Sequence, residues 1–214
     1  MNANYIYVAL CFIPLVLYLI KLRNFKLNVK KMVVIAMFSG LSFILSKIVF
    51  IQYPQGGSIN LLSSLPILLI GLIYGPVEGM TTGLITGVLG LFGGYIIHPV
   101  QLFLDFIIPP MILGLSGMFG SDSRAKVFFG CLIVVFLKCC VHVVSGVVFF
   151  ASSAEQFNMG PWLYSIVYNF SCAGVEGFLS LIVATILPLE KIKRKIQRQT
   201  RRKLLSKLDR NLCK

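Results

Sequence analysis

Long, uninterrupted apolar runs constrain the fold of this chain more than any other feature of its sequence. A helix of about 20 apolar residues crosses the roughly 30 Å hydrocarbon core of a bilayer, and several of the runs reach that length. Only 13% of the 214 residues are charged, about half the charged fraction of an average soluble domain. Membrane barrels use segments of roughly 10 residues with alternating polarity, which these continuous runs do not resemble. The sequence therefore predicts an all-α protein, a polytopic membrane bundle of helices.

Seven membrane spans are expected from the positions of these runs. Their approximate bounds are residues 4–21, 32–52, 60–74, 77–93, 95–120, 126–151 and 162–188. Basic residues follow the first span instead of preceding it, and no clear small-x-small cleavage site appears, which favours a retained helix over a signal peptide. We therefore expect three regions. They are an extra N-terminal transmembrane helix with a basic linker at 1–31, a six-helix membrane domain at 32–189 and a basic tail at 190–214.

The net charge of +13 is concentrated beside the expected spans. Eleven of the 20 Lys and Arg residues lie in 191–214, and five more lie in 21–31. Such juxtamembrane clusters bind the anionic lipids of the cytoplasmic leaflet, so nucleic acid is not expected as a partner. Because basic loops stay in the cytoplasm, the 121–126 loop should be inside, while the 53–59 and 152–161 loops, which hold no Lys or Arg, should be outside. We thus expect a multi-pass protein of the cell membrane with its N-terminus outside and its C-terminus in the cytoplasm.

The basic tail also carries an apolar stripe at multiples of four residues. The stripe consists of Ile192, Ile196, Leu204, Leu208 and Leu212. This spacing is typical of an amphipathic helix that lies on the membrane or against a cytoplasmic partner. A plain stop-transfer anchor explains the basic residues equally well, and the sequence leaves both interpretations open.

Motifs for catalysis or for a metal site are absent from the sequence. It has no G-x-x-x-x-G-K-[ST] loop for ATP hydrolysis, no H-E-x-x-H and no G-x-S-x-G. The six cysteines include no C-x-x-C pair and fall mostly inside expected spans, where they read as small packing residues. His98 and His142 are far apart in the sequence. We therefore expect neither an enzyme nor a bound metal or cofactor.

Asp105 is the only formal charge in the apolar run 95–120. An ionised carboxylate inside a membrane span costs about 3 kcal/mol on insertion scales and more in simulations. A chain keeps such a group when a cation meets it. Asp105 therefore predicts a cationic partner, either a ligand or a basic side chain.

Further polar and aromatic residues of the later spans are expected near Asp105. The sixth expected span repeats Lys138, His142, Gly146 and Phe150 every four residues, which places them on one helix face. The seventh adds Tyr164, Tyr168 and Asn169, and the fifth adds Tyr95 and Phe106. The residues in the outer half of the bundle predict a cavity that opens outward: His142, Gly146, Phe150, Tyr164 and Asn169, with Tyr95 and Asp105. Such a cavity binds a flat, cationic aromatic ligand, because the carboxylate neutralises the charge and the rings stack on it.

Several of these residues also have a purely structural interpretation. Tyr95 and Tyr164 fit an interfacial aromatic belt, and His142 fits a hydrogen-bonded packing residue. Lys138 could pair with Asp105 and leave no charge for a ligand. The sequence alone does not choose between these readings.

Three other charged residues belong to the apolar part of the chain. Lys47 is expected to snorkel to the outer interface. Glu78, beside the Gly75-Pro76 turn, is expected in solvent or at an interface. Glu176, deep in the seventh span, is either a carboxyl that bonds a neighbouring helix or a transport residue.

Small residues gather on two of the expected spans. The fourth span is rich in glycine, and the second carries Ala36-x-x-x-Gly40. Small residues at this spacing let helix backbones approach closely, either inside the bundle or against another membrane protein.

A long, ordered set of motifs also resembles a known family. Residues 54–120 run from PQGGSINLLSSLPILLIGLIYGP through TTGLITGVLGLFGGYIIHPVQLFLDFIIPP to GLSGMFG, and LKCCVHVVSGVVFF (137–150) and WLYSIVYNF (162–170) continue the pattern. These segments resemble the ThiT (YuaJ) family, the thiamine-specific substrate-binding subunits, or S components, of energy-coupling factor (ECF) transporters. The resemblance covers about 32–189. It implies a six-helix S-component core, with the first span and the basic tail as additions.

The resemblance implies a function and a set of site residues. The chain would capture thiamine from outside with high affinity, bind no cofactor of its own, and work with a transmembrane scaffold subunit and two ATPase subunits. Asp105 would face the cationic ligand, and Tyr95 would lie near its pyrimidine ring. The other pocket residues implied by position are Lys138, His142, Gly146, Tyr164 and Asn169, with Gly57 in the loop that closes over the ligand. Ala36 and Gly40 match the small-residue motif by which the subunit docks onto the scaffold.

Three residues depart from the usual pattern of that family. Phe150 stands where a tryptophan often stacks on the ligand, and Phe106 stands where a tyrosine is common. Asp105 takes the place of a glutamate and is one methylene shorter. Because phenylalanine is a weaker cation–π partner than tryptophan, a reduced affinity is expected.

Two rival functions stay open at this stage. A sibling importer subunit would take a thiamine precursor or another heteroaromatic vitamin. A stand-alone carrier would couple thiamine to protons through Asp105 or Glu176.

Overall fold

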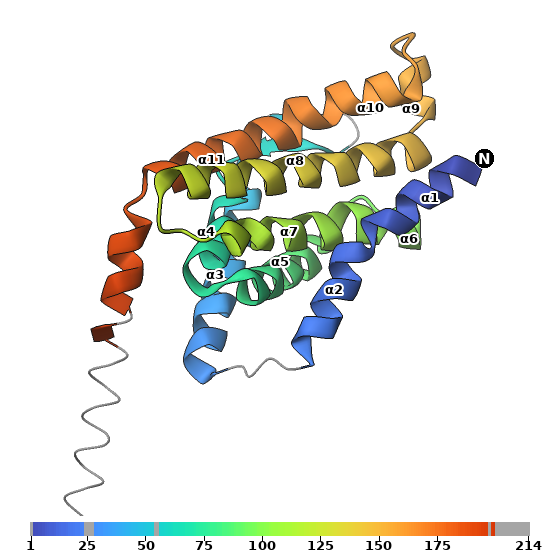
Figure 1. Cartoon of the computed structure of the whole chain (residues 1–214). Coiled ribbons are helices and arrows are strands. Elements are labelled where there is room, and N and C mark those ends of the chain that lie inside the picture. Colours follow the sequence, from blue (N-terminus) through green and yellow to red (C-terminus); the bar gives the residue numbers. More distant parts are fainter. Residues whose placement is uncertain (1, 24–27, 54–55, 197, 200–214) are drawn as a thin grey trace, which may run out of the picture.

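The computed structural model describes residues 2–23, 28–53, 56–196 and 198–199, and nearly all of its regular structure is helical (Figure 1). The α-helices are α1 (Asn2–Cys11), α2 (Ile13–Leu22), α3 (Val29–Ser46), α4 (Leu65–Tyr74), α5 (Pro76–Gly90), α6 (Pro99–Leu102), α7 (Ile108–Leu113), α8 (Arg124–Phe149), α9 (Ser152–Glu155), α10 (Pro161–Asn169) and α11 (Val175–Ile186). Two π-helical segments, η1 (Phe103–Ile107) and η3 (Phe170–Gly174), and a 3₁₀ segment, η2 (Gly114–Phe119), continue them. The predicted all-α membrane bundle is therefore confirmed.

Five helical stretches of the described chain are long and apolar enough to cross a membrane. They are Tyr5–Leu22, Val29–Ser46, Pro99–Phe119, Arg124–Phe149 and Pro161–Ile186. Two further spans are expected where α4 and α5 lie, but these helices hold only 10 and 15 residues. Gly75, with φ at 120°, ends α4, and Pro76 opens α5, so the chain turns sharply between them. The count of seven spans stays a prediction.

The expected span 32–52 is wrong at its C-terminal end. Helix α3 ends at Ser46, and the chain continues into strand β1 (Val49–Gln52), which pairs antiparallel with strand β2 (Ser58–Asn60). β-Branched and aromatic residues fill β1, and such residues favour strands. Gly56, with φ at 86°, lies in the turn where the chain reverses. A short apolar run cannot by itself distinguish the end of a helix from a strand.

Helix α5 packs at very short range against the segment from η1 to η2. An added Cβ at Gly83 would overlap the Pro110 carbonyl, and Gly79 and Gly87 are similarly close to neighbouring backbone. The glycines of α5 therefore serve packing inside the bundle. On α3, by contrast, Ala36 is exposed, and an added Cβ at Gly40 would have no neighbour within 4 Å.

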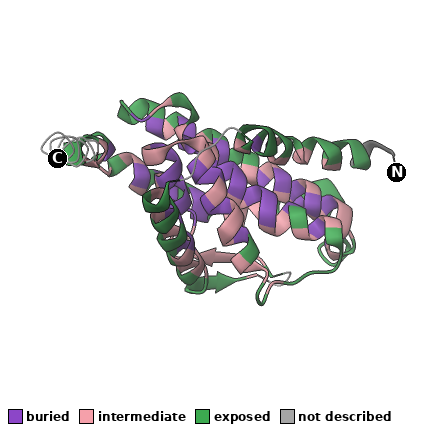
Figure 2. Ribbon diagram, turned by 90° about the horizontal axis from the view of Figure 1, so that it is seen from below, coloured by how far each residue is buried: buried purple, intermediate pink, exposed green. Residues whose placement is uncertain are grey.

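The apolar core lies among α4, η1, α7, α8 and α11. Its fully buried side chains include Leu68, Leu72, Leu104, Ile108, Leu113 and Leu181. Figure 2 shows the buried residues concentrated along the inner helices, whereas the N-terminal helix is mostly exposed. The exposed apolar side chains of a membrane bundle contact lipid tails, so lipid alone accounts for their position on the surface.

The N-terminal helical pair packs against the bundle. Helix α1 contacts α8, and α2 contacts α5 and α7. Pro14 lies in the first turn of α2, where its missing N–H is tolerated, and it separates α2 from α1. Tyr18 of α2 is only 3% exposed, and its hydroxyl lies 3.0 Å from Thr81 Oγ1. The division into 1–31 and 32–189 stays a prediction.

The expectation that the Glu78 carboxylate lies in solvent or at an interface is wrong, because the residue is buried in the bundle. It is 4% exposed, and Lys31 of α3 donates to its Oε1 at 2.6 Å. The ion pair offsets the desolvation of the carboxylate and ties the start of α3 to the start of α5.

The start of the basic tail is described, and the rest is not. Residues 189–196 are helical, with Leu189 and Ile192 packed against the core and Lys193 donating to Ser121 Oγ at 3.1 Å. Leu204, Leu208 and Leu212 of the expected stripe lie outside the described residues. The amphipathic helix over the whole tail therefore stays a prediction.

Candidate functional site

A cavity of about 460 Å³ lies among α3, the hairpin, α5, η1, α8 and α10–α11. This volume is in the range of about 300–1,000 Å³ that small-molecule sites occupy. All ten residues predicted to bind substrate line it: Gly57, Tyr95, Asp105, Phe106, Lys138, His142, Gly146, Phe150, Tyr164 and Asn169. The fold thus gathers residues from separate elements into one site, and their roles in binding stay predictions.

Asp105 presents its carboxylate to this cavity from the π-helical segment η1. Gln101 Nε2 donates to Oδ2 at 2.6 Å, and His142 Nδ1 lies 3.4 Å from Oδ1. The Asp105 side chain is 20% exposed. Nowhere in the described chain does a Lys or Arg form an ion pair with it. Asp105 is therefore held by the Gln101 amide and the His142 ring, and no Lys or Arg of the described chain neutralises its charge.

Lys138 pairs with Glu176 and not with Asp105, the partner that the sequence analysis left open. Its Nζ lies 3.1 Å from Glu176 Oε2 and 3.0 Å from Ser64 Oγ, not beside Asp105. The side chains of Lys138 and Glu176 are 12% and 3% exposed. Because these opposite charges cancel, the pair adds no net charge to the cavity.

Glu176 is the carboxyl that bonds a neighbouring helix. It accepts hydrogen bonds from Ser64 N at 2.8 Å and from Ser64 Oγ at 2.6 Å, at the start of α4. Ser63 Oγ at 3.2 Å and Ser180 Oγ at 3.1 Å complete its shell. This network joins α4, α8 and α11 at the cavity wall.

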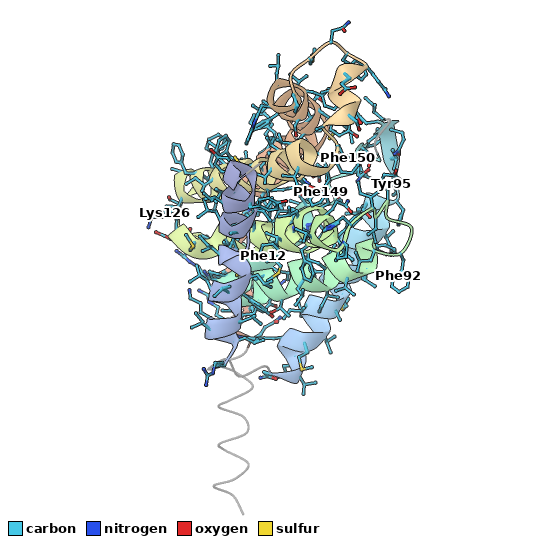
Figure 3. The ribbon with its side chains drawn as sticks, turned by 90° about the vertical axis from the view of Figure 1, so that its right-hand side faces the viewer. Phe12, Phe92, Tyr95, Lys126, Phe149 and Phe150 are labelled. Carbon is cyan, nitrogen blue, oxygen red and sulfur yellow. The ribbon has the colours of Figure 1, made fainter. Side chains whose placement is uncertain are left out.

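Aromatic side chains surround the mouth of the cavity. The rings of Tyr95 and Phe150 are tilted to one another at a centroid distance of 6.4 Å and lie at the same end of the molecule (Figure 3). Tyr164 and Tyr168 form a second tilted pair at 5.8 Å. Ring pairs of this kind offer faces on which a flat, cationic ligand can stack.

Gly146 serves helix packing, although the sequence suggested that it leaves room for a ligand. An added Cβ there would overlap Ser165 Oγ, so the glycine lets α8 and α10 approach closely. Asn169 reinforces this contact, because its Nδ2 donates to the His142 carbonyl at 3.3 Å and to the Ser165 carbonyl at 2.9 Å. Its amide oxygen is the group that a ligand can use.

The hairpin β1–β2 is held against the last membrane helix beside the cavity. Gly57 N donates to Tyr168 Oη at 2.9 Å, and an added Cβ at Gly57 would lie 2.6 Å from the same oxygen. The rings of Tyr53 and Tyr168 meet edge to face at 5.4 Å. The hairpin therefore has the position of a lid, and Gly57 provides the close approach to Tyr168.

Two more residues of the site were not identified as such from the sequence. Gln101 binds Asp105, and its position four residues earlier on the same helix face was the available signal. Tyr168 holds the hairpin, and the pattern placed it only near Tyr164. Lys47 reaches the rim, where its Nζ donates to the Phe92 carbonyl at 3.3 Å.

The described part of the chain has no group of three or more His, Cys, Asp or Glu side chains that could hold a metal ion. The site instead offers the Asp105 carboxylate, the Lys138–Glu176 ion pair, amide and imidazole groups, and aromatic faces. This combination suits an organic cation.

Comparisons with known proteins identify the family of this chain. The family model for "Thiamine transporter protein (Thia_YuaJ)" matches residues 32–196. The chain is similar to the thiamine transporter ThiT of Bacillus subtilis (strain 168), with 38% identity over 138 residues, which cover 56% of this chain and 69% of that protein. It is also similar to the thiamine transporter ThiT of Lacticaseibacillus paracasei, with 29% identity over 140 residues, or 58% of this chain and 69% of that protein.

A solved structure is similar as well. ThiT from Listeria monocytogenes superposes with a TM-score of 0.66 and 25% identity, and the match covers 75% of this chain and 93% of that one. The resemblance seen in the sequence is confirmed, because the family model spans most of the chain. The chain, a multi-pass membrane protein, therefore belongs to the thiamine transporter protein (Thia_YuaJ) family.

Proposed function

We propose that this chain is the substrate-binding membrane subunit of an ECF-type, ATP-driven importer, and that it captures thiamine from outside the cell. The observation that carries the proposal is the Asp105 carboxylate, which has no Lys or Arg partner in the described chain, in an aromatic-lined cavity. Thiamine is a monocation with a thiazolium ring and an aminopyrimidine ring. A carboxylate among aromatic faces matches this ligand in charge and in its flat rings.

The proposed steps follow from the position of each group. Thiamine enters at the Tyr95 and Phe150 end, Asp105 neutralises its charge, and His142 and Asn169 bond its polar atoms. The hairpin then closes through Gly57 and Tyr168. Release into the cytoplasm is driven by ATP hydrolysis on two partner subunits, through a scaffold subunit docked on α3.

The test of the ligand assignment is Asp105→Asn. Removing one member of a partly buried charge pair costs about 2–5 kcal/mol, so thiamine should bind at least about tenfold more weakly. Calorimetric titration of the purified full chain measures this, and an unchanged unfolding temperature shows that the fold is intact.

A matched control is Asp122→Asn. Asp122 is exposed in the loop before α8, and a hydrogen bond from Lys126 lowers the pKa of its carboxyl. This variant should bind thiamine like the wild type. Equal affinity of the Asp105 and Asp122 variants would contradict the role of Asp105.

A second ligand class is separated by titration with fragments. Thiamine, its pyrimidine half and its thiazolium half are compared on the same preparation. Tight binding of the neutral pyrimidine half alone would favour a precursor importer, because Asp105 would then have no cation to neutralise.

The alternative to an ATP-driven importer is a stand-alone carrier that couples thiamine uptake to protons. The pairing of Glu176 with Lys138 and serine donors argues against Glu176 as a proton carrier. Uptake in cells that lack the ATPase subunits should be lost. Uptake that survives there but collapses with an uncoupler would instead identify a proton-coupled carrier.

The orientation is proposed from charge. Arg124 and Lys126 lie at the start of α8, and Lys191, Lys193, Arg194 and Lys195 follow α11 at the same end of the bundle, where Lys193 donates to Ser121 in the loop before α8. The described residues 56–59 and 151–160 contain no Lys or Arg. Basic ends face the cytoplasm and its anionic lipids. Reporter fusions at the C-terminus of the chain should therefore report a cytoplasmic location.

A further inference from the structure

The N-terminal helical pair lies outside residues 32–196, the part that the family model matches, yet it contacts the segment that carries Asp105. The ring of Phe12, at the junction of α1 and α2, lies 5.8 Å from the ring of Phe103. Tyr18 belongs to one buried apolar cluster with Ile107. Phe103 and Ile107 are the first and last residues of η1, so Phe12 contacts the start of η1 and Tyr18 shares an apolar cluster with its end.

The geometry of η1 places these contacts behind the ligand site. Residues four apart on a helix share a face, whereas residues two apart do not. Phe103 and Ile107 therefore share the face toward the N-terminal helices, and Asp105, between them, points the other way into the cavity. The extra helices support the reverse side of the segment that presents the carboxylate.

Packing and a hydrogen bond hold Tyr18 of α2 in one position against the bundle. Tyr18 is 3% exposed and packs with Met80, Ile107 and Met111. Its hydroxyl lies 3.0 Å from Thr81 Oγ1, which in turn donates to the Val77 carbonyl at 2.8 Å. In a membrane no hydrophobic force drives helices together, so packing and hydrogen bonds of this kind decide where a helix docks.

The N-terminal helices support a π-helical segment, η1, which carries Asp105. π-Segments are rare, and they occur mostly as single-turn bulges at functional sites. In η1 the bulge coincides with the only acidic residue of the helical stretch Pro99–Phe119. Without Phe12, the partly exposed Phe103 ring would meet mobile lipid chains instead of a fixed side chain.

We propose that α1 and α2 form a brace behind η1, with Phe12 and Tyr18 as positioning residues that hold the Asp105 carboxylate toward a cationic ligand. This inference rests on the proposed function, because it concerns the affinity of that same site. It assigns the segment before residue 32 a role in ligand binding that the family match does not include.

The first experiment measures thiamine affinity of the full chain carrying Phe12→Ala. Loss of the ring should weaken binding by at least about fivefold, and Phe12→Leu, which still fills the space, should recover most of it. The matched control is Leu17→Ala on the same helical pair, because Leu17 is 55% exposed and faces away from the bundle. That control should bind like the wild type.

The second experiment asks whether the effect passes through Asp105. In an Asp105→Asn background, Phe12→Ala should cause little further loss, because the charge that it positions is already gone. Tyr18→Phe, which removes only the bond to Thr81, should act in the same direction with a smaller effect, and it keeps the test valid if Phe12→Ala does not fold.

The outcomes separate the two proposals. Equal losses with and without Asp105, or wild-type affinity in both Phe12→Ala and Tyr18→Phe, would overturn the brace while leaving the proposed function standing. A wild-type chain that does not bind thiamine at all would overturn the proposed function and, with it, the brace.

Discussion

At the scale of single residues, the site separates two carboxylates by the groups that surround them. Glu176 accepts bonds from Lys138, Ser63, Ser64 and Ser180, and its charge is cancelled within the protein. Asp105 is bound by the Gln101 amide and the His142 ring, and no Lys or Arg of the described chain pairs with it. A membrane protein can keep both acids because one is paired internally and the other is available to a cationic ligand.

The pairing of Glu176 predicts a loss of stability in Glu176→Gln. Lys138 would then be a buried cation without a counter-charge, which costs about 3–5 kcal/mol. The unfolding temperature of the purified chain should fall, whereas Glu155→Gln, at an exposed residue, should leave it unchanged. Adding Lys138→Met to Glu176→Gln should restore part of the loss, and no restoration would show that the ion pair is not the cause.

At the scale of elements, irregular segments bring the site together. The π-segment η1 carries Asp105, η3 follows Asn169, and the hairpin β1–β2 replaces the last turns expected of the second span. Each interrupts a helix beside the cavity. Such interruptions turn side chains and backbone toward a ligand in ways that a regular helix does not allow.

The lid contact predicts a faster release of thiamine in Gly57→Ala. The added Cβ would lie 2.6 Å from Tyr168 Oη, so the hairpin cannot close at its present distance. Because changes at an interface act mostly on dissociation, the off-rate should rise by about fivefold or more. Stopped-flow displacement measures it.

The matched control is Gly160→Ala. An added Cβ there has no neighbour within 4 Å, and its φ of −68° suits alanine. Its off-rate should equal that of the wild type. If Gly57→Ala gave the same off-rate as this control, the lid role of Gly57 would be wrong.

At the scale of the whole molecule, some outer faces of the bundle are covered by the N-terminal helices, and one face of α3 is exposed. The N-terminal helical pair covers parts of α5, α7 and α8. One face of α3 stays exposed and contains Met32, Val33, Ala36, Met37, Leu41 and Ile44, with Gly40 open beside it. A helix face with small residues and no partner in the bundle suits close contact with another membrane helix.

This exposed face predicts separate effects on transport and on binding. Ala36→Trp should lower thiamine uptake by at least about fivefold, because a large ring prevents close approach of the scaffold helix. Binding by the isolated subunit should be unchanged. Ile186→Trp, at an exposed position of α11, is the control and should keep uptake. Equal uptake in the two variants would contradict docking on α3.

Composition and order of residues determined the class of the fold and identified most of the residues that line the cavity. Hydrophobic length required a membrane bundle, and one charge in an apolar run marked Asp105. The four-residue repeat from Lys138 to Phe150 identified the facing helix, since all four of its residues line the cavity. These features depend on residues close together in the chain, so the sequence alone is enough to recognise them.

The tertiary structure decided what each charged group touches. Lys138 pairs with Glu176 and not with Asp105, Glu78 is buried against Lys31, and the end of the second span is a strand. No local pattern specifies these outcomes, because a partner distant in sequence is set by how helices pack. Packing also brings the N-terminal helices behind η1, where Phe12 lies against Phe103 although the two residues are far apart in the chain.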